Sequence, residues 1–136
     1  MYFKMLEDKK IMELDYLNKA KENINAAQIC FDNCLYNACA NRMYYALLQA
    51  VFVALKSRGI DRGKIDHKRV QADFAEKLIK RQKVYPTQYK SYLSSMQLIR
   101  NKADYLQDSI TQKVANRWLY RAKDLIELIE RKVKDD

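Results

Sequence analysis

Glycine and proline, the residues that most often end helices and build tight turns, are nearly missing from this chain, which has two glycines and one proline among 136 residues. A β-sheet protein would need many more of them at its turns. Leucine, alanine, lysine, glutamate and arginine, which favour helices, are abundant instead. These two features together predict an all-α protein.

The spacing of apolar residues divides the chain into five predicted helices. They cover about residue 8 or 13 to residue 33, residues 36–57, residues 66–80, a stretch that starts at Pro86 and ends near residue 105, and residues 109–134. The middle of the second helix is apolar on all sides, so we expect it to be the central one. Short connections predict antiparallel neighbours, and hence an up-and-down bundle of about five helices.

Single residues mark the expected helix ends. Gly59 is predicted to cap the end of the second helix, and Asp66 to cap the start of the third. Pro86 suits the first turn of the fourth helix, and Ser109 with Gln112 forms a capping-box pattern before the fifth.

The tyrosines of the fourth helix allow two interpretations. They recur with apolar residues at helical spacing, as Tyr85, Tyr89, Tyr92, Met96 and Ile99. With lysines between them, they resemble a platform on which nucleic-acid bases stack. A single continuous face is, however, the usual pattern of core packing, and we expect these side chains to lie in the core.

A central helix without a polar face needs more cover than four amphipathic helices of this length provide. We therefore expect a helix face to pack against a second copy of the chain. A homodimer is the commonest arrangement of this kind.

The chain is predicted to be cytoplasmic and to make no membrane contact. Its first residues, MYFKMLEDKK, have no uninterrupted apolar region followed by a cleavage site. The longest apolar stretch, residues 43–55, is shorter than the about 20 residues that span a bilayer.

Three cysteines lie close together in the sequence, at Cys30, Cys34 and Cys39. A zinc site would need four ligands, and neither a histidine nor a second cysteine pair is near. We expect three free thiols in a reducing compartment, and no metal or other cofactor.

The formal net charge is +9, and the basic residues are unevenly distributed. Residues 77–103 contain seven lysines and arginines and no acidic residue, and residues 56–69 add six basic residues against two acidic ones. Such a region suits the phosphates of a nucleic acid or the surface of an acidic protein. A solvated lysine-rich surface is the other interpretation.

Most enzyme signatures are missing from the sequence. Two glycines cannot build a phosphate-binding loop, and the single histidine, His67, is not accompanied by a strained nucleophile turn. Cleavage of RNA through its own 2′-hydroxyl stays open, because it needs only a proton acceptor, a proton donor and a cation.

The segment around Arg100 offers candidates for these roles. Arg100 suits the cation, since a guanidinium grips phosphate with two N–H groups. Asp104, four residues later on the same helix face, would orient Arg100 or simply pair with it. A phenol has a reference pKa of about 10 and is a poor base at neutral pH, so Tyr105 is expected to donate a hydrogen bond.

Four segments of the chain, in this order, resemble the HEPN family (higher eukaryotes and prokaryotes nucleotide-binding). They are YNACANRMYYALLQAVF (36–52), DHKRV (66–70), PTQYKSYL (86–93) and LIRNKADY (98–105). The last is similar to the arginine and ADY signature of a small stand-alone subfamily. The resemblance covers about residues 12–134 and implies a single HEPN-like domain, 1–136, which dimerises with the arginine motif in a cleft at the two-fold axis.

The resemblance also implies a site. Many HEPN proteins are metal-independent endoribonucleases with an R-x(4–6)-H motif that often begins Arg-Asn, and Arg100 and Asn101 match this start. Tyr105 stands where the histidine would be, and no histidine follows. This departure argues against ribonuclease activity of the familiar kind.

Other motif residues complete the expected site. Those expected to bind RNA or a nucleotide are Arg42, Tyr45, Arg100, Asn101 and Lys102.

Two of the motif residues raise questions of their own. Arg42 lies beside an apolar run and needs a partner if it is buried, for which Asp104 is the candidate. His67 matches a family histidine early in the third helix. It is expected either to make a structural hydrogen bond or to reach the Arg100 cleft as an acid–base group.

Three functions follow as hypotheses. The favoured one is an RNA- or nucleotide-binding HEPN-like protein that works with a small nucleotidyltransferase in a toxin–antitoxin or defence module. The first alternative is a metal-independent endoribonuclease toxin whose candidate catalytic residues are Arg100, Asp104, Tyr105 and His67. The second is a non-catalytic adaptor whose positive surface meets an acidic protein.

Overall fold

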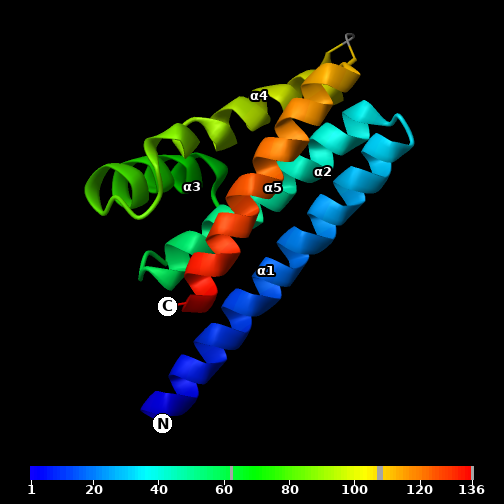
Figure 1. Cartoon of the computed structure of the whole chain (residues 1–136). Helices are drawn as coiled ribbons and strands as arrows, with labels where there is room; N and C mark the ends of the chain where they lie inside the picture. The colour runs from blue at the N-terminus through cyan, green and yellow to red at the C-terminus, as the bar shows by residue number, and fades with distance from the viewer. Residues whose placement is uncertain (62, 107–108, 136) are drawn as a thin grey trace.

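The computed structural model describes residues 1–61, 63–106 and 109–135, and all regular elements in these ranges are helical (Figure 1). The α-helices are α1 (Tyr2–Asp32), α2 (Tyr36–Ser57), α3 (His67–Asp73), α4 (Tyr92–Tyr105) and α5 (Gln112–Asp135). A π-helical segment, η1 (Phe74–Arg81), continues α3, and a 3₁₀ turn, η2 (Thr87–Tyr89), precedes α4. The predicted all-α fold of about five helices is confirmed.

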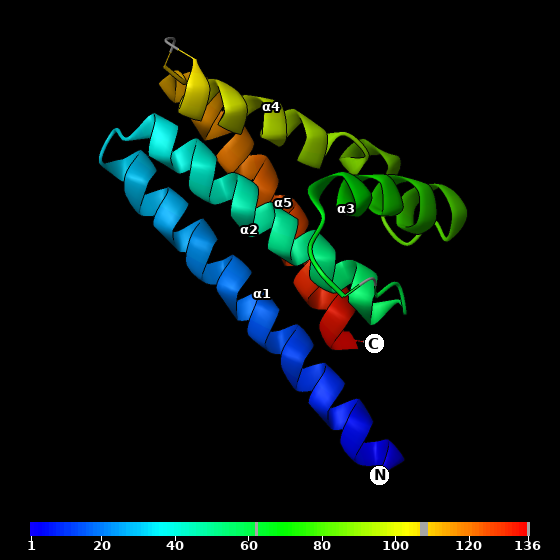
Figure 2. The ribbon, with the colours of Figure 1, turned by 180° about the vertical axis from the view of Figure 1, so that it is seen from behind.

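Helix α2 is the central element of the bundle. It contacts α1, α3, α4 and α5, and Figure 2 shows it between α1 on one side and α4 and α5 on the other. Every residue from Ala50 to Lys56 is buried. By length and composition α2 would be able to cross a membrane, but 72% of its most apolar stretch lies inside the bundle. Its predicted central position is therefore confirmed.

The tyrosines before and within α4 belong to the core. Tyr85, Tyr89 and Met96 are buried, and Tyr92 is half-buried. The Tyr92 ring packs edge-on against the rings of Tyr89 and Trp118, with centroid distances of 5.1 and 5.7 Å. The interpretation as core packing is confirmed, and this row is not an open stacking platform.

Two predicted helix ends are confirmed. Gly59 follows the end of α2 with a φ of +81°, a left-handed conformation that glycine adopts without strain. The N–H groups of Gly59 and Ile60 donate to the carbonyl oxygens of Lys56 and Leu55, both at 3.0 Å. At the start of α3, Asp66 accepts a hydrogen bond from the N–H of Arg69 at 3.2 Å.

Two other predicted starts are wrong. Pro86 does not open α4, because its backbone is extended (ψ 150°) and the helix begins at Tyr92. The intervening turn lets Tyr89 donate a hydrogen bond to Asp124 on α5 at 2.7 Å. The side chain that caps α5 is Thr111, which accepts from the N–H of Val114 at 3.2 Å, so the capping box at Ser109 is not formed.

Helix α1 begins earlier than predicted, at Tyr2. Its first turns extend past the other helices at the N-terminal end in Figure 1, and Tyr2, Phe3 and Met5 are exposed. No glycine or proline interrupts these residues. The helix therefore continues without the burial that the spacing argument relies on.

The three cysteines are free thiols in different surroundings, as predicted. Cys34 lies exposed in the turn between α1 and α2, and Cys39 is buried in α2. Burial raises the pKa of the Cys39 thiol to about 11, and the nearby Cys30 adds to the effect.

We expect a thiol reagent to distinguish these residues at pH 8. About one in a thousand Cys39 side chains would be thiolate at that pH, so Cys39 should stay unmodified in the folded protein while exposed Cys34 reacts. Mass spectrometry of labelled peptides before and after denaturation measures this. Labelling of native Cys39 as fast as Cys34 would contradict it, and Cys39→Ser should leave the native labelling pattern unchanged.

Candidate functional site

The predicted site residues gather around two adjacent tyrosines of α2. The guanidinium carbon of Arg100, on α4, lies 5.4 Å from the ring centroid of Tyr44 and 5.3 Å from that of Tyr45. The Arg100 side chain is 15% exposed. A cation at this distance from aromatic faces is attracted to them, so the two rings hold the guanidinium in place.

A carboxylate fixes Arg100 from its own helix. The Nε of Arg100 donates to Oδ2 of Asp104 at 3.3 Å, one turn later on α4. The same oxygen accepts a hydrogen bond from Nδ2 of Asn41, on α2, at 3.0 Å. Asp104 therefore ties α4 to α2 at the place where Arg100 lies.

Arg42 stands beside this pair, and its expected ion pair with Asp104 is wrong. Its Nε donates to Oδ1 of Asn41 at 3.1 Å, and a terminal nitrogen donates to Oδ1 of Asn23 on α1 at 3.3 Å. The Asp104 carboxylate binds Arg100 and Asn41 instead. Arg42 is connected to that carboxylate only through the Asn41 amide. The Arg42 guanidinium also lies 5.5 Å from the Tyr45 ring centroid.

His67 reaches the same rings from the start of α3. Its Nδ1 lies 2.9 Å from the hydroxyl oxygen of Tyr44, a hydrogen bond. Its ring centroid is 5.7 Å from that of Tyr44 and 6.2 Å from that of Tyr45. The expected structural hydrogen bond is present, and it places His67 against the rings that hold Arg100. An acid–base role for His67 stays a prediction.

A hydrogen bond joins α3 directly to α4 beside these contacts. Gln71, one turn after His67, donates to the side-chain oxygen of Gln97 at 2.6 Å. Gln97 lies almost one turn before Arg100 on α4. The glutamine pair thus joins the two helices next to the cluster.

The electrostatics of the cluster keep Arg100 charged. Burial works against the charge, but Tyr45 and Asp104 outweigh it and raise the pKa of Arg100 above its ordinary value. Burial also raises the pKa of Tyr44, although a hydrogen bond with Gln71 and the charge of Arg100 oppose this shift. The cluster therefore presents a charged guanidinium against two aromatic rings.

The remaining predicted residues are exposed. Asn101 and Lys102 are exposed on α4, and the Tyr105 side chain, at the end of the helix, is 73% exposed. The structure thus brings together Arg100, Asp104, His67, Arg42 and Tyr45, which come from three helices.

Sequence reasoning missed the residues that connect the cluster. These are Tyr44, which joins His67 to Arg100, together with Asn41, Gln71, Gln97 and Asn23. Polar side chains within an apolar helix were the available signal, since Asn41 and Gln49 interrupt α2 and both find partners on other helices.

Metal binding finds no support in these groups. In the ranges that the structure describes, no three histidine, cysteine, aspartate or glutamate side chains come close enough to hold an ion.

Comparison with known proteins places the whole bundle in one family. Residues 14–132 match the HEPN domain. The chain belongs to the HEPN domain family. The match runs from within α1 to within the last turns of α5, so it includes all the residues of the Arg100 cluster.

Two relatives of this HEPN chain are similar over most of its length. It is 28% identical over 116 residues to “Putative toxin MJ0605” of Methanocaldococcus jannaschii, which covers 85% of this chain and 84% of that protein. It is 29% identical over 133 residues to a “UPF0332 protein” of Thermotoga maritima, which covers 96% of this chain and 97% of that protein.

We expect the Tyr44–His67 hydrogen bond to contribute about 1 kcal/mol to the free energy of unfolding, as a half-buried side-chain hydrogen bond does. A double-mutant cycle with Tyr44→Phe and His67→Phe keeps both rings and removes the bond. Urea unfolding of the four proteins gives the coupling. The matched control is the cycle of Tyr105→Phe with His67→Phe, in which the changes in unfolding free energy should add. Additive changes in the Tyr44 cycle would contradict the hydrogen bond.

Proposed function

We propose that this HEPN protein binds RNA and that Arg100 holds a phosphate of the bound strand. The observation that carries the proposal is the Arg100 guanidinium, held on the rings of Tyr44 and Tyr45 and fixed by Asp104. Only one of its five N–H donors is used by that carboxylate, and a planar guanidinium matches the oxygens of a phosphate.

The neighbouring charges favour a strand over a single nucleotide. Arg42 places a second cation against Tyr45, and exposed Lys102 and Asn101 follow Arg100 on α4. The basic residues of η1 contribute less, because Lys77 pairs with Asp73, and Lys80 and Arg81 pair with Glu76. The surface along α4 therefore suits a phosphate backbone better than that of η1 does.

Several contacts favour binding over cleavage. Asp104 is occupied by Arg100 and Asn41, and His67 is engaged with the Tyr44 hydroxyl. Tyr105 takes the place of the motif histidine. A general acid or base must be able to reach the proton it transfers, and Asp104 and His67 are held by other partners.

One observation favours the endoribonuclease as a second candidate. His67, the single histidine of the chain, contacts the same two rings as Arg100. Loss of its Tyr44 hydrogen bond on RNA binding would free the imidazole nitrogen for proton transfer at the cluster.

Fluorescence anisotropy with a labelled single-stranded RNA tests the binding. We expect Arg100→Ala to weaken binding about tenfold, equivalent to about 1.4 kcal/mol. The slope of log affinity against log salt concentration should also fall by about one, as expected for the loss of one phosphate contact. The matched control is Arg131→Ala, which removes an exposed arginine of α5 and should keep most of the affinity.

Incubation of the same RNA with the protein in EDTA separates the two candidates. Intact RNA is the expected result. Cleavage that disappears in both Arg100→Ala and His67→Phe would instead establish the endoribonuclease, and no RNA binding by the wild type would overturn the proposal. Circular dichroism of each variant checks that its helices are intact.

We further propose that the protein is a homodimer that joins through α4. Leu98, Tyr105 and Leu106, which lie along and just after this helix, are 71%, 73% and 63% exposed. Large apolar side chains in such a row usually mark an interaction surface. A two-fold axis here would bring two Arg100 residues to one cleft, as the HEPN resemblance implies.

Sedimentation velocity tests the dimer. We expect the wild type to sediment as a dimer at tens of micromolar, and Leu98→Glu as a monomer, because a charge in an apolar interface is costly. Ile29→Glu, at a site on α1 that is 63% exposed, is the control and should leave the dimer intact. A monomeric wild type would contradict the proposal.

The wider role is proposed from the family. The similarity to a protein named as a toxin, and the HEPN motifs, support a cytoplasmic toxin–antitoxin or defence module whose other member is a small nucleotidyltransferase. A reading frame for such an enzyme beside this one would support the pairing.

A further inference from the structure

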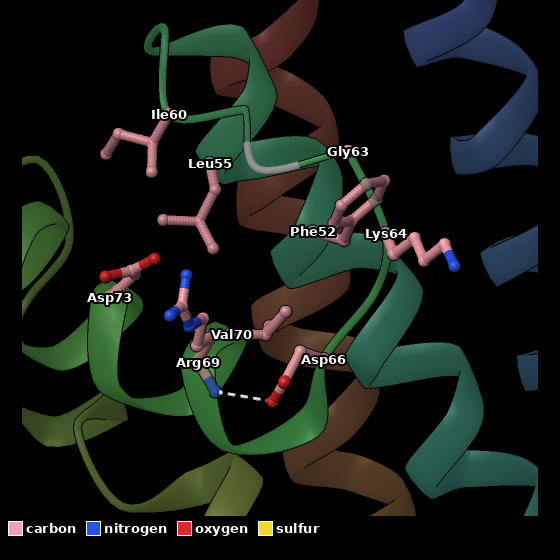
Figure 3. A pocket seen from close by; sticks show the side chains of 9 residues that line it. All are labelled: Phe52, Leu55, Ile60, Gly63, Lys64, Asp66, Arg69, Val70 and Asp73. Atoms are coloured by element: carbon pink, nitrogen blue, oxygen red, sulfur yellow. Dashed lines mark hydrogen bonds between the residues drawn. The ribbon is translucent and has the colours of Figure 1, made fainter.

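A pocket of about 400 Å³ lies between the end of α2, the loop that follows it, and α3 (Figure 3). The volume is within the range of about 300–1,000 Å³ that small ligands occupy in proteins. Its lining residues are Phe52, Leu55, Ile60, Gly63, Lys64, Asp66, Arg69, Val70 and Asp73. None of them belongs to the Arg100 cluster.

One part of the pocket is apolar. Phe52 and Leu55 from α2 and Val70 from α3 are buried, and Ile60 from the loop is half-buried. Figure 3 shows Leu55 and Ile60 near each other, and Val70 is a further lining residue on α3. Such walls favour a flat apolar group and provide no hydrogen bonds to it.

Two oppositely charged side chains of α3 line the pocket. Arg69 and Asp73 are four residues apart, and Figure 3 shows the guanidinium and the carboxylate next to each other and near Leu55. Asp73 is buried and already forms an ion pair with Lys77 at 3.6 Å, whereas Arg69 is exposed. Arginine only donates hydrogen bonds and a carboxylate only accepts them, so these two lining residues together match a ligand edge that carries both kinds of group.

The pocket and the Arg100 cluster lie along one face of α2. Tyr45 and Phe52 are seven residues apart, which is two helical turns or about 10 Å. Helix α3 borders both places, because His67 contacts the tyrosine rings while Arg69 and Val70 line the pocket. Neighbouring nucleotides of an extended strand would therefore reach both.

We propose that this pocket receives an unstacked nucleobase of the RNA whose phosphate binds at Arg100. A nucleobase has two apolar faces and an edge with donors and acceptors side by side, which is the combination that the pocket offers. The inference rests on the proposed RNA binding and adds to it a base-binding subsite. Phosphate contact at Arg100 positions the strand, and the pocket selects a base.

A series of RNA oligonucleotides with one abasic position each tests the subsite. An abasic nucleotide keeps its phosphate and loses its base, so contact at Arg100 is unchanged. We expect the wild type to bind most of the series equally, and one oligonucleotide about tenfold more weakly, as loss of one bound base causes. The readout is competition against a labelled intact strand.

Variants of the pocket complete the experiment. Arg69→Gln should bind the abasic and intact strands with equal affinity, whereas Lys68→Gln, which removes an exposed neighbouring cation outside the pocket lining, should keep the tenfold difference. Equal binding of every abasic strand by the wild type would overturn the subsite, even if Arg100→Ala still weakens binding. No RNA binding by the wild type would overturn the proposed function itself.

Discussion

The burial of α2 is the constraint on which the rest of the structure depends. Every side chain from Ala50 to Lys56 is covered by neighbouring helices, and burial of such apolar surface is the main driving force of folding. Burial also requires every polar side chain inside the bundle to have a partner, since an unpaired one costs about 1–3 kcal/mol. Within the described residues, no buried side-chain nitrogen or oxygen lacks a hydrogen bond.

This requirement accounts for the form of the candidate site. Three polar residues that interrupt the apolar surface of α2, Asn41, Arg42 and Gln49, are each paired with a neighbouring helix. Gln49 and Arg42 bind Asn23 on α1, and Asn41 binds Asp104 on α4. The hydrogen bonds that satisfy the polar side chains of α2 also help to hold Arg100 in position. A side chain that is already held in place loses little conformational freedom when a ligand binds.

The fold was predictable from the sequence because its signals are local. The scarcity of glycine and proline, the apolar spacing, Gly59 and Asp66 correctly predict the helical class, the central α2 and two helix ends. Where a distant contact competes with a local signal, the prediction is wrong. Pro86 is a residue that suits the first turn of a helix. Its backbone is extended instead, and Tyr85 and Tyr89 on either side of it are buried in the core.

The sequence by itself determined which residues are available for chemistry: an Arg100 motif without its histidine, a single His67 and a basic central region. Only the tertiary structure decided their partners. Arg100 and Asp104 share one helix, so their pairing follows from their spacing. His67 meets Tyr44, and Arg42 meets Asn23, across different helices. The spacing within one helix cannot specify such contacts, because they depend on how the helices rotate and cross when the core packs.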